Sequence, residues 1–404
     1  MVHLAAESKT ANHVAWTRVA RLRSQMEMHG IEAAVCTKPE STFYLSGFNP
    51  IIYSHPVIVI VTPHHEPILL VFVIRGEHAQ ASAWTSSIRL FGSWSNIKTT
   101  AATWQEALGI ILNELGVTRK RIGVEHGSIS VTQYREIAET APEADLVNIS
   151  PCIDLCRQIK DVDEVDNARV AARIADVGME AAVAALRQKG ATERDVAIAS
   201  MQAMNEYWAT NYPEVEIADF GSPEGGNHNG LTTWVLSGPR KSYACDNPTP
   251  RAPKPGETVS VFIWTVSNGI HAELERTVCI GPASLTEKAA IKSVLEIREE
   301  IEAHLRPGIP VKALYETARN GYISRGYSQC LPGRIGHSIG LGSHESVSIN
   351  GSSDLILTAG MVLTLEPHIH IFGVCGTQFS DTLLITEAGF EYLTHFPRQY
   401  LEVQ

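Results

Sequence analysis

The sequence predicts two domains, an N-terminal α/β domain over residues 1–155 and a C-terminal α+β domain over residues 156–404. Three observations predict this fold class. The chain has 404 residues, more than one ordinary hydrophobic core organises. Short β-rich runs alternate with helical patterns as far as Pro151, and long alanine-rich helical patterns follow it. Between residues 256 and 281, two β-rich runs flank an Asn-Gly pair, which predicts a β-hairpin.

Helical and strand patterns alternate through the N-terminal part. Apolar residues at helical spacing predict a helix from Val14 to His29, which ends at Gly30. The alternation that follows predicts a largely parallel or mixed sheet. The further elements expected are strands at 31–36, 57–62, 67–74, 121–125 and 145–149, and helices at 104–115 and 132–139.

The C-terminal part is expected to place two carboxylates on one strand. Helices are expected at 162–188, 193–208, 285–305 and 311–325, with the hairpin strands at 259–266 and 270–280. Glu273 and Glu275 are two residues apart in the second hairpin strand, so both face one side of the sheet. Two buried carboxylates on one face are costly unless a cation lies between them. The sequence therefore predicts a cation-binding site on this strand.

Composition and charge exclude several classes of function. The formal net charge is -11, which argues against nucleic acid and anionic membranes as partners and favours a small-molecule substrate. The N-terminus lacks the pattern of a signal peptide, and no stretch has the length of a membrane span. The seven cysteines are scattered and include no CxxC pair, as in a reduced protein. We therefore expect a cytoplasmic protein.

Three further segments carry residues suited to catalysis. The glycine-rich stretch GRIGHSIGLGSHE places His337 and His344 seven residues apart, where the backbone can approach a ligand closely. The run LTLEP ends on Glu366, and SDTLLITEAG begins with Ser380 and Asp381. Each of these residues lies at the end or the start of a β-rich run, as active-site residues often do.

Taken in order, RQIKDVDEV, GIHAELERT, GHSIGLGSHE, LTLEP and SDTLLITEAG resemble a known family. From about Gln158 onward the chain is similar to the pita-bread fold of methionine aminopeptidases, proline dipeptidases and aminopeptidase P. With its N-terminal α/β domain it resembles the creatinase branch over nearly its full length. The resemblance implies a creatinase-like N-terminal domain and a pita-bread catalytic domain.

The resemblance also implies a set of five metal ligands, of which this sequence keeps a part. The metallopeptidases of this fold hold two metal ions, and the five matching positions here are Phe262, Glu273, His337, Glu366 and Ser380. A phenyl ring cannot coordinate a metal, and a hydroxyl group binds one poorly. We therefore expect no metal and no cofactor, with a single metal ion on the three remaining ligands as the open alternative.

Creatinase and ectoine hydrolase have this fold with degraded metal sites. The resemblance to them implies a metal-independent hydrolase of a non-peptide C–N bond, such as an amidine, guanidine, amide or cyclic amide, in a small nitrogenous compound. In creatinase the residues at the positions of Glu275 and Glu366 embrace the substrate guanidinium. On this hypothesis these glutamates bind a cationic group, Glu273 assists, and His337 and His344 transfer protons.

Cys245 takes the position of the creatinase histidine that acts as general acid and base, counted from Ser237 and Gly238. A thiolate beside His337 or His344 would be a strong nucleophile, able to attack an amidine, amide or imide carbon. The alternative is that Cys245 is a small buried residue. The sequence leaves the two possibilities open.

The resemblance also suggests substrate contacts and a homodimer. Creatinase clamps its substrate carboxylate with arginines, one from the N-terminal domain of the partner subunit; the matching positions here are His55, preceded by Tyr53, and Ser348. The loss of both arginines argues against creatine as the substrate. We expect a homodimer with the N-terminal domain of one subunit near the site of the other. The remaining expected substrate-binding residues are Phe262, Glu273, His228, His368 and Ser380.

Two further hypotheses accompany the hydrolase. One is a peptidase related to aminopeptidase P and prolidase, with a reduced metal site. The other is a catalytically inactive pita-bread module used for binding. The retention of four charged or titratable residues disfavours the inactive module, because buried charges are costly in a site without function. These residues are Glu275, His337, His344 and Glu366.

Overall fold

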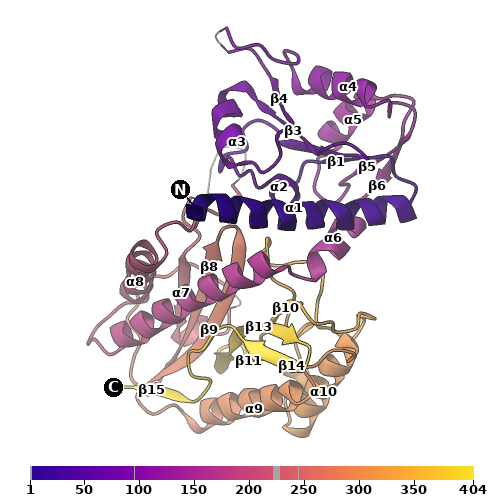
Figure 1. Ribbon diagram of the computed structural model, residues 1–404. Coiled ribbons are helices and arrows are strands. Elements are labelled where there is room, and N and C mark those ends of the chain that lie inside the picture. Colours follow the sequence, from indigo (N-terminus) through magenta and orange to yellow (C-terminus); the bar gives the residue numbers. More distant parts are fainter. Residues whose placement is uncertain (1, 95, 222–227, 244) are drawn as a thin grey trace. The chain divides into compact units, whose positions relative to one another are not determined.

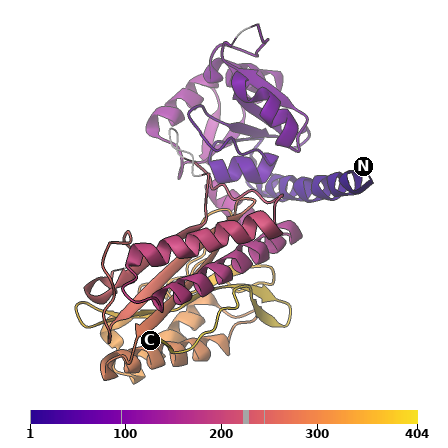
Figure 2. The same ribbon diagram turned by 90° about the vertical axis from the view of Figure 1, so that its left-hand side faces the viewer.

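A computed structural model describes residues 2–94, 96–221, 228–243 and 245–404, which form two compact units (Figures 1 and 2). The first unit contains Met1–Arg157 and Asp219–His228, and the second contains Gln158–Ala218 and Asn229–Gln404. Residues 219–221 and 228 therefore group with the first unit, although they follow two helices of the second. None of the helices in the described ranges is long and apolar enough to cross a membrane.

The first unit is built on a mixed sheet with strand order β4-β3-β2-β1-β5-β6. The pairs β1–β5, β5–β6 and β3–β4 are parallel, and β2 runs antiparallel to β1 and β3. Its elements are α1 (Val2–Met28), β1 (Ala33–Cys36), α2 (Pro39–Ser46), β2 (Ile58–Val61), β3 (Ile68–Phe72), α3 (Gly76–Ser82), β4 (Ile88–Phe91), α4 (Trp104–Glu114), β5 (Arg121–Val124), α5 (Val131–Thr140), β6 (Asp145–Asn148) and α6 (Ser150–Gln158).

The second unit is built on a curved sheet with strand order β10-β13-β9-β8-β7 (Figure 1). Strand β14 pairs with β13, β15 pairs with β9, and β11 and β12 form a separate hairpin. Its elements are α7 (Val162–Leu186), α8 (Glu193–Asn211), β7 (Thr232–Ser237), β8 (Thr258–Ser267), β9 (Ile270–Ile280), α9 (Leu285–Glu302), α10 (Val311–Ser324), β10 (Val362–Leu365), β11 (His368–Ile371), β12 (Cys375–Gln378), β13 (Ser380–Thr386), β14 (Gly389–Tyr392) and β15 (Leu401–Val403).

Two hydrophobic cores surround this sheet. Helices α7 and α8 lie side by side and pack with β7, β8 and β9 in one core (Figure 2). Helices α9 and α10 pack with β10, β12 and β13 in the other. Helix α7 begins at a capping box in which Asp161 accepts from the backbone N–H of Glu164 and Glu164 accepts from that of Asp161. The predicted combination of an α/β domain with a pita-bread α+β domain is confirmed.

The predicted hairpin is β8–β9, and its turn fixes which residues face one another. Asn268 and Gly269 have φ values of 46° and 80°, the left-handed conformation that a two-residue hairpin turn requires. The register then pairs Ser267 with Ile270 and continues to Thr258 with Cys279. Every residue of the second strand from Ile270 to Cys279 is buried, so both of its glutamates lie inside the protein.

Four short elements of the first unit lie outside the predicted set: α2, α3, β4 and α6. The STFYLSG segment, rich in aromatic and turn residues, forms most of α2 (Pro39–Ser46). This helix begins at a proline, ends at Gly47 in a left-handed conformation, and buries Tyr44 and Leu45. Both end signals are the usual ones for helices. Tertiary burial, rather than periodicity over only eight residues, stabilises this helix.

Candidate active site

Four segments of the second unit bring the candidate residues together. Glu273 and Glu275 lie on β9, Ser380 begins the neighbouring β13, and Glu366 directly follows β10 on the other side of β13 (Figure 1). The segment before β10 carries His337. It lies close against that strand, because a Cβ atom at Gly336 would come within 2.2 Å of the Thr364 carbonyl oxygen.

Glu273, His337 and Glu366 form the group whose ligand atoms converge within 4.8 Å of one another. His337 Nε2 lies 3.6 Å from Glu273 Oε2 and 3.8 Å from Glu366 Oε1. The side chains of Glu273 and His337 are each 1% exposed and that of Glu366 is 11% exposed. The three residues come from positions up to 93 apart in sequence (366 − 273), so only the folded sheet assembles them.

The ring of His337 is oriented so that one nitrogen faces the two carboxylates. Nδ1 lies 3.1 Å from the Ser338 carbonyl oxygen, which fixes Nδ1 as the proton donor. Nε2 is buried and has no hydrogen-bond partner among the described residues, because both carboxylates are beyond hydrogen-bond distance. A buried nitrogen without a partner is costly unless it binds a ligand or is protonated beside the carboxylates.

The Glu273 carboxylate is also held by two protein donors. The Ser380 hydroxyl donates to Oε1 at 2.5 Å, and the Trp264 indole N–H donates to Oε2 at 3.0 Å. Burial alone raises the pKa of Glu273, but the adjacent His337 and the Ser380 hydroxyl lower it more, so the net pKa lies below its usual value. Glu273 is therefore the carboxylate of the site that remains ionised.

The two other carboxyl groups are shifted in the opposite direction. Burial and the negative charges of Glu273 and Glu366 raise the pKa of Glu275 well above its usual value. Burial and the charge of Glu273 raise the pKa of Glu366 to about 7. Gln378 Nε2 donates to Glu275 Oε2, and Arg334 Nε lies 3.3 Å from Glu366 Oε1. The site thus combines one carboxylate whose pKa is lowered with two carboxyl groups whose pKa values are raised.

His344 lies over His337 at the solvent side of the site. The ring centroids are 4.2 Å apart, and His344 is exposed whereas His337 is buried. Burial of part of the ring and the nearby His337 lower the pKa of His344. The next residue, Glu345, forms a buried ion pair with Lys160 of the RQIKDVDEV motif, with Nζ 2.5 Å from the carboxylate. This ion pair fixes the loop that carries His344.

Cys245 is not brought to the buried residues of the site. It is exposed and lies between β7 and β8, and within the described residues no hydrogen bond joins it to His337 or His344. The alternative that Cys245 is a small buried residue is wrong, because its side chain is exposed.

Phe262 and His368 lie near the site by register and sequence. Phe262 is 1% exposed and pairs with Glu275 across the hairpin. His368 is two residues after Glu366 and is partly buried; its Nδ1 lies 3.3 Å from the Glu366 carbonyl oxygen. The rings of His368 and His370 contact each other with centroids 4.5 Å apart. Burial lowers the pKa of both histidines, to about 3 for His370.

Three expected substrate-binding residues belong to the first unit. Tyr53 is partly buried and its hydroxyl donates to Asn49 at 3.2 Å. His55 is exposed and stacks on Phe72, with ring centroids 3.8 Å apart. His228 is exposed and groups with the first unit. The role of His55 in a partner's site therefore stays a prediction, as does the homodimer.

Three side chains around the site were not predicted from the sequence: Trp264, Gln378 and Arg334. The first two could have been found. The Asn-Gly turn places residue 264 opposite residue 273, and Gln378 lies two residues before Ser380 on a β-rich run. Arg334 carries no such signal, because it lies in an irregular glycine-rich segment whose path depends on the whole fold.

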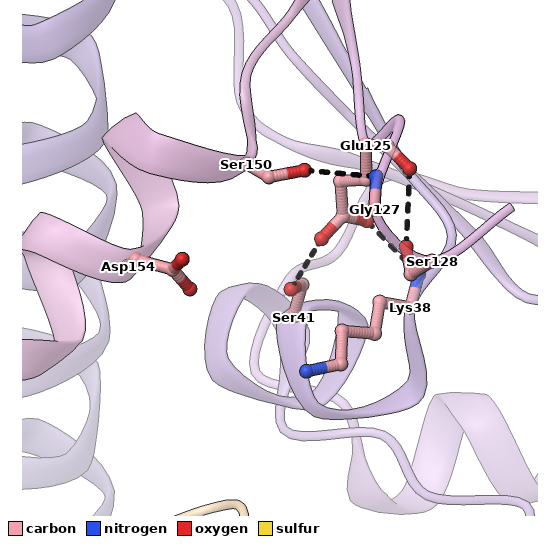
Figure 3. Close-up of a pocket in the computed structure, with 7 residues that line it drawn as sticks. All are labelled: Lys38, Ser41, Glu125, Gly127, Ser128, Ser150 and Asp154. Atoms are coloured by element: carbon pink, nitrogen blue, oxygen red, sulfur yellow. Dashed lines mark hydrogen bonds between the residues drawn. The ribbon is translucent and has the colours of Figure 1, made fainter. Parts of the chain in front are cut away.

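A second polar cavity, of about 140 Å³, lies in the first unit (Figure 3). Its buried carboxylate is that of Glu125, which is 2% exposed and accepts hydrogen bonds from the backbone N–H groups of Thr37 and Lys38 and from the Ser41 hydroxyl. These donors lie at the start of α2, where a carboxylate stabilises the helix terminus. Glu125 is therefore a structural residue. The cavity is lined by Lys38, Ser41, Glu125, Gly127, Ser128, Ser150 and Asp154.

Comparison with known proteins identifies the class. Residues 166–387 match the model of metallopeptidase family M24, and residues 18–159 match that of the creatinase/prolidase N-terminal domain. The protein belongs to metallopeptidase family M24. An uncharacterized peptidase of Staphylococcus aureus (strain MSSA476) is 25% identical over 95% of this chain and 100% of its own length.

Solved structures show the same fold over nearly the whole chain. The Xaa-Pro dipeptidase from Bacillus anthracis superimposes with a TM-score of 0.81 at 22% identity and covers 96% of this chain and 100% of its own. The prolidase from Pyrococcus horikoshii OT3 gives a TM-score of 0.79 at 23% identity, covering 95% and 100%. The predicted creatinase/pita-bread fold is thereby confirmed.

The expectation of a metal-independent, creatinase-like hydrolase of a non-peptide C–N bond is wrong. The chain belongs to a metallopeptidase family, its relative from Staphylococcus aureus is named a peptidase, and the two solved structures above are an Xaa-Pro dipeptidase and a prolidase. The physical reason is that the replacement of two ligands, at Phe262 and Ser380, does not separate the other three. Glu273, His337 and Glu366 still converge.

Proposed function

We propose that the protein is a peptidase that cleaves short peptides and uses a single divalent metal ion held by Glu273, His337 and Glu366. The observation that carries this proposal is the buried His337 Nε2, which faces two carboxylates and has no hydrogen-bond partner in the part of the chain that the structure describes. Membership of family M24 and the dipeptidase and prolidase neighbours support the choice of a peptide as substrate.

The three side chains suit one metal ion. Ligand atoms about 2.0–2.2 Å from a tetrahedral ion lie roughly 3.4 Å apart, close to the observed 3.6 and 3.8 Å. The hydrogen bond from His337 Nδ1–H to the Ser338 carbonyl leaves the Nε2 lone pair for the metal, as in many metal-ligating histidines. One histidine and two glutamates leave a coordination position open, which is typical of catalytic rather than structural sites.

The same residues do not suit a second metal ion. Phe262 offers no ligand atom, and the Ser380 hydroxyl is used as a donor to Glu273 Oε1. The other oxygen of Glu273 accepts from the Trp264 indole N–H. Hydrogen bonds and aromatic rings therefore occupy the space that further carboxylate ligands for a second metal ion would need.

The site has residues for each requirement of peptide hydrolysis. A divalent ion held by Glu273, His337 and Glu366 would polarise the peptide carbonyl group and lower the pKa of a bound water. Hydrolysis breaks the C–N bond, forms a C–O bond and delivers a proton to the leaving amine. His344 is exposed and contacts His337, so it can exchange a proton between the site and solvent. Ser380 and Trp264 hold the Glu273 carboxylate in place.

The proposal is tested on the purified full chain, stripped of metal with a chelator and reloaded with Zn²⁺, Mn²⁺ or Co²⁺. We expect about one equivalent of tightly bound metal. We also expect hydrolysis of dipeptides, and Xaa-Pro dipeptides are tested first. His337→Ala should lower both metal content and activity at least about 100-fold, since it removes a ligand. His304→Ala, an exposed histidine after α9, is the matched control and should change neither.

Two outcomes would overturn the proposal. Full peptidase activity in the presence of chelator would show that no metal takes part. Binding of one metal equivalent without turnover of any peptide would support the inactive binding module instead.

A further inference from the structure

A row of aromatic side chains runs beside the acidic residues on the same face of the sheet. Across the β8–β9 hairpin, Trp264 pairs with Glu273 and Phe262 pairs with Glu275. On the other side of β8, Trp234 of β7 pairs with Phe262. Directly paired residues point to the same face of a sheet, and residues two apart on one strand do so too. We call Trp234, Phe262 and Trp264 the aromatic wall.

The rings of the aromatic wall pack together but leave surface exposed. The Trp234 and Trp264 centroids are 4.6 Å apart at an interplanar angle of 59°. The Phe262 and Trp264 rings are parallel within 3°, with centroids 6.2 Å apart. Phe262 is buried, whereas both tryptophans are partly exposed. Apolar surface that stays exposed beside a polar site is a candidate binding surface, because covering it is favourable.

The aromatic wall is joined directly to the proposed metal ligands. The Trp264 indole N–H donates to Glu273 Oε2 at 3.0 Å, and the same oxygen lies 3.6 Å from His337 Nε2. A substrate whose carbonyl group reaches Glu273 and His337 must therefore place the groups next to that carbonyl within reach of the tryptophan rings.

We propose that the aromatic wall binds an apolar or aromatic side chain of the substrate, on the residue next to the bond that is cleaved. The inference rests on the proposed peptidase function for the nature of the substrate, and it adds the class of side chain that the site prefers. It assigns Trp234 and Trp264 as specificity-determining residues.

The charges around the aromatic wall favour an apolar group over a cation. A cation would gain most from an unpaired carboxylate beside the rings. Among the described residues, each carboxylate already has protein partners. Glu273 accepts from two donors, Glu275 accepts from Gln378, and Glu366 lies 3.3 Å from Arg334. A bound metal ion would neutralise the site further, so an uncharged side chain is the better fit.

Binding of amino acid amides tests the inference without turnover. We would titrate the full chain with L-alaninamide, L-leucinamide, L-phenylalaninamide and L-lysinamide by calorimetry, with and without Zn²⁺. Burial of a leucine or phenylalanine side chain should make these two amides bind at least about tenfold more tightly than L-alaninamide. The same order should appear in kcat/KM for dipeptides that differ only in this residue.

Variants locate the effect on the aromatic wall. Within the described residues no hydrogen bond joins Trp234 to the metal-ligand residues, so Trp234→Ala should remove most of the preference for L-phenylalaninamide and leave L-alaninamide binding unchanged. Trp234→Phe should keep part of the preference, which separates a local effect from a folding defect. Trp94→Ala, a 58% exposed tryptophan of the first unit, is the matched control and should have no effect.

The results separate the inference from the proposed function. Equal affinity for all four amides, or tightest binding of L-lysinamide, would overturn the apolar subsite. A preference for L-phenylalaninamide that Trp234→Ala abolishes would support it even if no peptide were hydrolysed, in which case the peptidase proposal alone would fail.

Discussion

Replacing Asp381 by asparagine would remove a negative charge that several arginines share inside the second unit. Asp381 is fully buried, and its carboxylate lies 2.7 Å from Arg276, 2.8 Å from Arg298 and 3.2 Å from Arg398. The Thr394 hydroxyl donates to it at 2.8 Å. Two of the guanidinium groups, those of Arg276 and Arg298, are themselves only 2% exposed.

The cost follows from the burial of these arginines. Removing one partner of a buried ion pair leaves an uncompensated charge and costs about 3–5 kcal/mol. Arg276 also donates to the backbone carbonyls of Ser380 and Glu275, and Arg298 to that of Leu365, so neither can turn to solvent without disturbing the site. A loss of this size corresponds to a fall of roughly 6–20 °C in the melting temperature of a unit of about this size.

Thermal unfolding followed by circular dichroism would measure the loss. Asp354→Asn is the matched control: Asp354 forms an exposed ion pair with Lys312, and such pairs contribute little. A fall of less than about 1 kcal/mol for Asp381→Asn would refute the reasoning, because it would show that the arginines gain no net stabilisation from the buried carboxylate.

The same cluster of Asp381 and its arginines predicts how the stability of the folded protein depends on pH. Burial opposes ionisation of Asp381, but the arginines dominate and hold its pKa below the usual value. A carboxyl group with a lowered folded-state pKa stabilises the protein fully above its unfolded pKa of about 3.9, and this stabilisation is lost as the pH falls through the folded-state pKa. Wild-type stability should therefore fall below about pH 4, and Asp381→Asn should flatten that part of the profile.

Three further predictions concern the site. Ser380→Ala removes the hydroxyl donor to Glu273 and should weaken metal binding about tenfold, measured with a competing chelator, since such supporting contacts commonly contribute this much. Lys160→Met leaves the buried Glu345 without its ammonium partner, so we expect faster hydrogen exchange in residues 338–347 and a lower kcat. Unchanged exchange in these residues would contradict the conclusion that the ion pair fixes the loop that carries His344. The double variant Phe262→Asp, Ser380→Glu should bind about two equivalents of metal instead of about one, as measured by elemental analysis. A stable double variant that still binds one equivalent would contradict the idea that these two positions prevent binding of a second metal ion.

The β8–β9 hairpin shows which parts of the site a local sequence pattern can predict. The Asn-Gly turn predicts both strands and, because a two-residue turn fixes the register, also predicts that Phe262 faces Glu275 and Trp264 faces Glu273. What the turn does not predict is the hydrogen bond from Trp264 to Glu273, because that depends on the rotamers of two buried side chains.

The convergence of the three proposed metal ligands cannot be predicted from a local pattern such as the hairpin turn. Glu273, His337 and Glu366 are far apart in sequence, and no periodicity relates them; the prediction that they meet came from the resemblance to a family. Distant contacts also determine the role of Arg240 and Lys241, two adjacent cations to which no local pattern assigns a partner. In the structure Arg240 pairs with Glu193, and Lys241 with Glu287, contacts 46 or more residues distant.

The strand that carries the acidic residues is completed late during synthesis. Strand β9 (Ile270–Ile280) gains one neighbour at once from its hairpin, but on its other edge it pairs with β13 (Ser380–Thr386) and β15 (Leu401–Val403). At about 5–20 residues per second, the ribosome needs roughly 6–25 s to add the 123 residues between 280 and 403. Until β13 and β15 are synthesised, this edge of β9 lacks its strand partners, and the nascent chain is exposed to mispairing with other chains. We therefore expect a chaperone that acts in this interval to raise the yield of folded protein.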